Sequence, residues 1–214
     1  MQLQGLGRFA DYYDSGDCFY CKDGHTSRCT KSLLFGSPKL DGGQAEYVRV
    51  PLADGSVMKA PDSVSDQALV LMADIFPTGY YGVRSAIELC PRVKVSESVM
   101  VIIGCGPVGL CAIAAASHAG PKRIFAIDSV DSRLELARSL GAEPLNFLHD
   151  KDGMIAAIKE ATAGRGADMV VEVVGQPAAL QTAYDVVRPF GAISSIGVHG
   201  AEVSTPRHVD HICR

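Results

Sequence analysis

The pattern of apolar and polar positions changes near residue 99. From there to residue 196, short apolar runs alternate with segments whose apolar residues recur at helical spacing. The runs predict strands at residues 99–103, 123–127, 144–147, 168–174 and 192–196. The segments between them predict helices at residues 110–119, 132–140, 153–163 and 177–187. Such alternation predicts an α/β fold with a doubly wound parallel sheet.

The chain before residue 99 has a weaker pattern. Its first 60 residues are rich in Gly, Asp and Pro, and they contain short β-like runs such as AEYVRVP at residues 45–51, so we expect irregular loops around a few strands. Two helices are predicted next, one capped by Ser65 and one over residues 78–89. We therefore divide the chain into a first segment, residues 1–90, and a sheet domain, residues 91–214.

A G-x-G-x-x-G turn follows the first predicted strand of the sheet. Its first glycine permits a tight turn, its second lets a pyrophosphate approach the backbone, and its third lets the helix pack closely on the strand. The N-terminus of the helix that follows offers unpaired N–H groups and a partial positive charge to a diphosphate. The residues predicted to contact the diphosphate are Gly104, Gly106, Pro107, Val108 and Gly109.

An acidic residue ends the next predicted strand. Asp128 stands nineteen residues after Gly109. A carboxylate there can accept hydrogen bonds from both hydroxyls of an adenosine ribose, and it repels the extra phosphate of NADP. The sequence therefore predicts NAD as the cofactor, with Arg133 on the following helix as a second ribose contact.

Composition and charge exclude several classes of protein. The net charge of −4 gives no electrostatic footprint for nucleic acid. Residues 99–117 carry no charge and are nearly long enough to cross a bilayer, but the GCGPVG turn interrupts them. The first residues lack the basic start and apolar run of a signal peptide. We expect a cytoplasmic protein without a membrane or nucleic-acid partner.

Three of the seven cysteines lie close together in the sequence. Cys18, Cys21 and Cys29 have spacing that favours metal binding over a disulfide framework. Redox chemistry of the C-x-x-C pair is not favoured, because the pair neither follows a strand nor opens a clear helix. His208, His211 and Cys213 also have metal-like spacing, but a polar terminal tail makes a structured site there unexpected.

Together these segments resemble the zinc-dependent medium-chain alcohol dehydrogenases, including the formaldehyde and sorbitol dehydrogenase branches. The resemblance covers about residues 14–199 and is carried by four blocks. They are the cysteine segment, GGQAEYVRVPLAD, LMADIFPTGYYGV, and GCGPVGL with IDSVDSRLELARSLGAE. The resemblance implies a Rossmann domain for NAD, preceded by part of an irregular β-rich, GroES-like catalytic domain.

The resemblance also implies a structural zinc lobe with the pattern C-x-x-C-x-x-C-x7-C. Cys18, Cys21 and Cys29 match the last three cysteines, and Ser15 stands at the place of the first. A neutral hydroxyl is a poor zinc ligand, so Asp14, Asp17 or water would have to complete the site, or the site would stay empty. A loop with three reduced thiols is the alternative.

In this family a residue before the T-G-Y motif supplies the third ligand of a catalytic zinc. The matching position here is Asp74, whose alternative role is that of an ordinary helix-end cap, and Thr78 would lie against the nicotinamide. The family's other two ligands come from a segment before the zinc lobe, but no cysteine or histidine precedes Cys18. Because the final strand of the sheet is also not found, we expect an internal fragment of a dehydrogenase.

The implied activity is NAD-dependent oxidation of a small alcohol or aldehyde by hydride transfer, with zinc as Lewis acid. A catalytically silent, truncated NAD-binding remnant is the alternative. Relatives form homo-oligomers through the last strand of the sheet, which this sequence does not show, so oligomerisation is left open.

Overall fold

The computed structural model describes residues 12–200, and the candidate ligands His208, His211 and Cys213 lie outside them. The backbone forms two compact units that meet in the sequence between Pro77 and Thr78. Helix α4 (Ile75–Glu88) belongs mostly to the second unit, because its residues Val83 and Ala86 share a core with the sheet. The division predicted from the sequence, after residue 90, falls beyond this helix.

The first unit consists of short elements joined by loops. Strand β1 (Tyr12–Tyr13) pairs antiparallel with β2 (Leu33–Leu34). The helical turns are α1 (Phe19–Lys22), η1 (Thr26–Arg28), α2 (Ala53–Ser56) and α3 (Asp66–Leu71). The capped helix predicted after Ser65 is confirmed, since the Ser65 side chain accepts a hydrogen bond from the Ala68 amide.

One β-like run of the first unit does not form a strand. Bends cover residues 45–47 and a turn begins at residue 51, so this β-like run is not one of the few strands expected among the loops. The side chain of Tyr47 is 79% exposed, so this aromatic ring does not pack on an apolar surface as it would on the inner face of a sheet. Tertiary context therefore overrides local β preference at this position.

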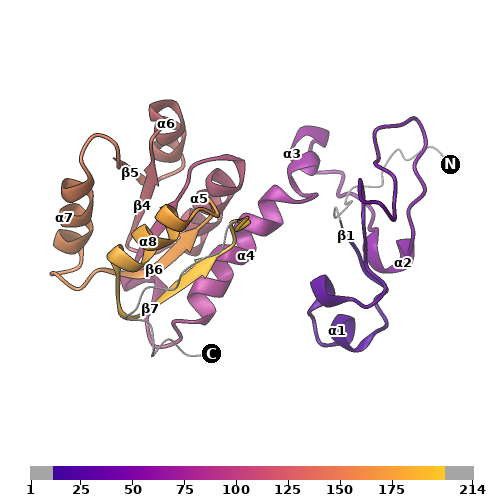
Figure 1. Ribbon diagram of the computed structural model, residues 1–214, viewed down its shortest axis with the longest axis horizontal. Helices are drawn as coiled ribbons and strands as arrows, with labels where there is room; N and C mark the ends of the chain where they lie inside the picture. Colours follow the sequence, from indigo (N-terminus) through magenta and orange to yellow (C-terminus); the bar gives the residue numbers. More distant parts are fainter. Residues whose placement is uncertain (1–11, 201–214) are drawn as a thin grey trace. The chain divides into compact units, whose positions relative to one another are not determined.

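The second unit is built on a parallel sheet. Its five strands within residues 12–200 are β3 (Val99–Ile103), β4 (Arg123–Asp128), β5 (Glu143–Asn146), β6 (Ala167–Glu172) and β7 (Val187–Ser195). They lie in the order β5-β4-β3-β6-β7 with every neighbouring pair parallel (Figure 1). The predicted α/β fold with a doubly wound parallel sheet is confirmed.

Strand β7 begins five residues before its predicted start at residue 192. The register against β6 shifts between Ala167 and Met169, and Phe190 has a φ of 57°. Arg188 and Pro189 interrupt the apolar pattern here, so the first part of the strand carries no period-2 signal.

Besides α4, four helices cover the two faces of the sheet: α5 (Pro107–Ala119), α6 (Asp131–Ser139), α7 (Lys151–Ala161) and α8 (Pro177–Val186). Alternate residues of β3 face opposite cores: Met100 and Ile102 pack with α4, α5 and α6, and Val101 packs with α7 and α8. Helix α5 begins three residues earlier than predicted, because Pro107 suits the first position of a helix.

The topology creates a crevice beside the carboxyl ends of β3 and β6. From β3 the chain continues to β4, which lies toward one edge of the sheet. From β6 it continues to β7, which lies at the opposite edge. Loops that diverge in this way open a binding crevice at the point where the strand order reverses. Among residues 12–200, no helix has the length and apolar character needed to cross a bilayer.

Candidate functional site

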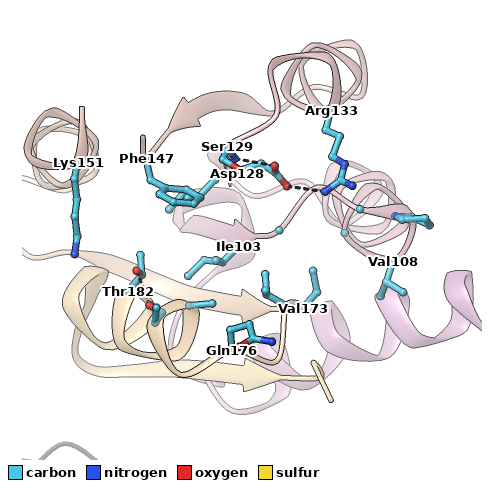
Figure 2. A pocket seen from close by; sticks show the side chains of 18 residues that line it. Ile103, Val108, Asp128, Ser129, Arg133, Phe147, Lys151, Val173, Gln176 and Thr182 are labelled. Atoms are coloured by element: carbon cyan, nitrogen blue, oxygen red, sulfur yellow. Dashed lines mark hydrogen bonds and ion pairs between the residues drawn. The ribbon is translucent and has the colours of Figure 1, made fainter. Parts of the chain in front are cut away.

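A cleft of about 590 Å³ lies at this switch point. Its volume is in the range of small-molecule and cofactor sites. The structure brings together in it every residue that the sequence predicted to bind the cofactor: Gly104, Gly106, Pro107, Val108, Gly109, Asp128 and Arg133. Figure 2 shows Arg133 and Val108 at one end of the cleft and Phe147 and Lys151 at the other.

The three glycines of the turn differ in what a side chain would meet. Gly104 has a φ of 96°, a conformation that favours glycine. A Cβ on Gly109 would lie 1.8 Å from the Gly104 carbonyl oxygen, so this position requires glycine for helix packing. A Cβ on Gly106 would meet no atom within 4 Å, and Gly106 borders the cleft. Open space therefore lies where a side chain would stand, directly at the N-terminus of α5.

Asp128 is held in place by the backbone around it. Its Oδ2 accepts a hydrogen bond of 2.7 Å from the Cys105 amide, and its Oδ1 accepts hydrogen bonds from the Ser129 and Val130 amides at 2.7 and 2.9 Å. A guanidinium nitrogen of Arg133 lies 3.9 Å from Oδ2 (Figure 2). An ionised carboxylate has about four acceptor sites, so one remains for a ligand hydroxyl.

The cleft also contains residues that the sequence argument did not single out, among them Phe147, Lys151, Gln176 and Thr182. Phe147 and Gln176 follow the carboxyl ends of β5 and β6, so the rule that ligands bind beyond strand ends would have found them. Lys151 and Thr182 lie on α7 and α8, and nothing in the sequence pattern indicates that they face the cleft.

A buried glutamate fixes the loop after β6. Glu172 is fully buried, and its Oε1 accepts hydrogen bonds of 2.7 Å from the amides of Val174 and Gly175. Its Oε2 accepts a hydrogen bond from the Ser195 hydroxyl at 2.7 Å and lies 3.4 Å from Nε2 of His199. Because Val174 lines the cleft, this carboxylate positions part of the cleft wall. No spaced motif in the sequence indicates this glutamate.

The cysteine cluster lies in the first unit. The sulfur atoms of Cys18, Cys21 and Cys29 all lie within 4.8 Å of one another, and Cys18 and Cys21 are 3.5 Å apart. The hydroxyl of Ser15 lies 3.5 Å from the Cys29 sulfur and 3.9 Å from the Cys21 sulfur. Cys18 is the cap of the one-turn helix α1, so the expectation that no helix begins at this pair was wrong.

Backbone amides favour the thiolate form of two of these cysteines. Hydrogen bonding from the backbone at Cys21 and Thr30 lowers the pKa of Cys18 to about 6. The Ser15 side chain and the amides of Ser15 and Lys31, at 3.3 and 3.4 Å from the sulfur, lower the pKa of Cys29. Desolvation and its neighbouring thiols raise the pKa of Cys21. Three clustered thiols with amide donors fit a zinc ion, which binds thiolates.

Asp74 and Thr78 lie apart from this cluster in the sequence. Asp74 is exposed in the turn before α4, and Thr78 is half-buried in the first turn of that helix. Next to Thr78, a Cβ on Gly79 would lie 2.8 Å from the Val108 carbonyl oxygen, so α4 approaches the start of α5 closely. Within residues 12–200, the three cysteines are the one group of three potential metal ligands, and Asp74 is not part of it.

Comparison with known proteins gives consistent matches. The model of the zinc-binding dehydrogenase family matches residues 107–212. A zinc-type alcohol dehydrogenase B of Aspergillus flavus is 58% identical over 88% of this chain and 44% of its own length. A medium chain reductase/dehydrogenase of an Acremonium species is 60% identical over 86% of this chain and 63% of its own length.

Solved structures agree with the sequence matches. An alcohol dehydrogenase from a Thermus species superposes with a TM-score of 0.85 at 32% identity, covering 94% of this chain and 59% of that one. The chain thus spans roughly half the length of the proteins it matches. The expected resemblance is confirmed, and the chain belongs to the family of zinc-dependent medium-chain alcohol dehydrogenases.

Proposed function

We propose that the protein is an oxidoreductase that binds NAD in the switch-point cleft and takes part in the oxidation of a small alcohol or aldehyde. The open space at Gly106 carries the proposal, because it lies at the N-terminus of α5 inside a cleft of cofactor size. Unpaired amides and the positive end of a helix favour a diphosphate there. The names of the relatives, alcohol dehydrogenase and reductase/dehydrogenase, support the class of reaction.

Each part of the cleft has a proposed task. Gly104 to Gly109 hold the diphosphate, Asp128 accepts one hydrogen bond from the adenosine ribose, and Arg133 is a second ribose contact. Thr78 lies near the start of α5 and is proposed to face the nicotinamide. When NAD is bound, it supplies a hydride acceptor, and the protein orients it.

Two metal roles are proposed from the family. Cys18, Cys21 and Cys29 are proposed to hold a structural zinc, which their geometry fits. Asp74 is proposed to supply one carboxylate ligand to a catalytic zinc. Residues 12–200 bring no second and third ligand to Asp74, so they do not form a catalytic zinc centre on their own.

Calorimetric titration with NAD tests the cleft. The Gly106→Val substitution adds a side chain where the protein leaves open space, so the fold should persist while NAD affinity falls at least about tenfold, or about 1.4 kcal/mol. The matched control is Gly42→Ala, where a side chain also meets nothing within 4 Å but lies in the first unit. If Gly106→Val bound NAD with unchanged affinity, the diphosphate would not bind at this turn.

The choice between NAD and NADP is read from the same titrations in Asp128→Ala. This substitution also removes three backbone hydrogen bonds, so the ratio of the two affinities is the informative quantity rather than either affinity alone. Loss of the carboxylate should shift the ratio toward NADP. A ratio equal to that of the wild type would show that Asp128 does not select the cofactor.

A further inference from the structure

The cysteine cluster has a fourth polar group among its sulfurs. The Ser15 hydroxyl lies 3.5 Å from the Cys29 sulfur and 3.9 Å from the Cys21 sulfur. It accepts hydrogen bonds from the amides of Asp17 at 3.3 Å and Cys18 at 3.4 Å. These two amides fix the position of the hydroxyl oxygen beside the thiols.

The carboxylates on either side of Ser15 are engaged elsewhere. Asp17 pairs with Lys22 at 2.9 Å, and its side chain is 77% exposed. Asp14 accepts a hydrogen bond of 2.9 Å from the Gly16 amide. Neither carboxylate joins the group of ligand atoms formed by the three cysteines. Of Asp14, Ser15 and Asp17, Ser15 is therefore the residue placed among the sulfurs.

We propose that Ser15 Oγ completes a metal site with three thiolates and one neutral oxygen. In a tetrahedral zinc site with bond lengths of about 2.3 Å to sulfur and about 2.1 Å to oxygen, sulfur–sulfur edges are about 3.8 Å and sulfur–oxygen edges about 3.6 Å. The observed edges of 3.5 Å for Cys18–Cys21, and of 3.5 and 3.9 Å from Ser15 to Cys29 and Cys21, are close to these values.

Metal uptake would change the hydrogen bonds of the hydroxyl. In the metal-free cluster, the Cys29 thiol donates to Ser15 Oγ. Binding zinc converts the thiols to thiolates and releases their protons, so the Cys29 donor is lost. A hydroxyl has two lone pairs, so the metal must also replace one of the two long amide hydrogen bonds, at 3.3 and 3.4 Å, that Ser15 Oγ accepts. The neutral oxygen binds more weakly than a fourth thiolate, so the metal should exchange with a chelator faster than from a four-cysteine site. This inference rests on the proposal that the cluster holds zinc.

Cobalt substitution in the full chain tests the donor set directly. Tetrahedral Co²⁺ has intense visible bands, and its charge-transfer absorption grows with the number of bound thiolates. The wild type should bind one Co²⁺ with the absorption of three thiolates, and Ser15→Cys should add about one third to it. Zinc affinity, measured by competition with a chromophoric chelator, should fall at least about tenfold in Ser15→Ala.

Control variants separate Ser15 from its neighbours. Ser37→Ala removes a hydroxyl that likewise accepts a backbone hydrogen bond, from Lys39, without lying in the cluster. It should leave zinc affinity unchanged, as should Asp17→Asn. The role of Ser15 would be overturned if Asp17→Asn lost more zinc affinity than Ser15→Ala. It would also be overturned if a folded Ser15→Cys protein had the same Co²⁺ absorption spectrum as the wild type. Absence of any metal uptake would overturn the zinc site itself, while the NAD titrations would be unaffected.

Discussion

The two units of this chain hold their candidate sites in different ways. In residues 14–77, whose side chains the structure describes, the buried apolar residues are Cys29 and Leu40. The second unit has two cores, one on each face of the parallel sheet, and three residues of β3, Met100, Val101 and Ile102, are fully buried. The sheet is therefore held by apolar burial, whereas the first unit has little of it.

This difference shows what each site depends on. The cleft is formed by backbone turns at the ends of buried strands, and its acid Asp128 is fixed by three backbone amides. The cysteine segment has short helical turns and few buried side chains, so a bound metal would supply most of its crosslinking. A small unit with too little core commonly relies on a metal or disulfides in this way.

Metal removal should have the largest effect, and it should be confined to the first unit. A complete structural zinc site contributes about 10–16 kcal/mol of apparent binding energy in zinc-finger peptides, and three thiolates should retain a good part of it. Adding EDTA to the zinc-loaded protein should abolish hydrogen-exchange protection of amides in the loop, such as His25, which donates to the Tyr20 carbonyl at 2.7 Å.

Protection of the β3 amides should persist in the same sample, because the sheet contains no metal ligand in this proposal. Zinc-saturated EDTA is the control, since it cannot take up the metal. If protection were lost equally in both units, or in neither, the contrast between a metal-held and a core-held unit would be wrong.

Thiol reactivity in the metal-free protein should differ by orders of magnitude between the units. Cys18, with a pKa of about 6, is largely thiolate at neutral pH, whereas burial raises the pKa of Cys105 to about 12. Because a lowered pKa means deprotonation at lower pH, Cys18 alkylation should rise from about pH 5 to about pH 7 and then level off.

Mass-spectrometric peptide mapping after iodoacetamide treatment measures both thiols in one experiment. Cys105 should be labelled only after urea is added, and Cys111, another buried thiol of the second unit with a raised pKa, should behave like it. Labelling of Cys105 at the rate of Cys18 in native protein would mean that the turn after β3 is open, against the core-held description of that unit.

The same contrast explains what the sequence could predict. The strands of the second unit carry near-continuous apolar runs, so the parallel sheet followed from the pattern, and the glycine spacing placed the turn residues in one cleft. The start of β7 escaped prediction, because Arg188 and Pro189 break its pattern. In the first unit the run at residues 45–51 has a β-like pattern but does not join the pair of strands β1 and β2.

There is also a physical reason why the sequence predicted only some of the residues at the candidate sites. Asp128 and the cysteines belong to spaced motifs, which a sequence displays directly. Glu172 positions the cleft wall through amides of its own loop and the Ser195 hydroxyl, and Lys151 reaches the cleft from a helix surface. Such contacts depend on tertiary packing rather than on spacing, so no local pattern indicates them.

A core substitution should have the smallest of the three effects and should be confined to the second unit. Ile102 is fully buried in β3, with Ala126 on one neighbouring strand and Val171 on the other at the same register. Ile102→Ala leaves a cavity that the two paired strands cannot easily close. The substitution should therefore lower the free energy of unfolding of the second unit by about 2–5 kcal/mol. Urea titration followed by hydrogen exchange of β3 amides measures the loss.

Zinc affinity of Ile102→Ala should stay at the wild-type value, because the cysteine loop and β3 belong to different compact units. Leu34→Ala, at a side chain that is 47% exposed in the first unit, is the control, and it should change the stability of the sheet by less than about 0.5 kcal/mol. A fall in zinc affinity of the Ile102 variant that matched its loss of sheet stability would show that the two units unfold as one. The metal would then contribute to the stability of the cleft as well as to that of its own loop.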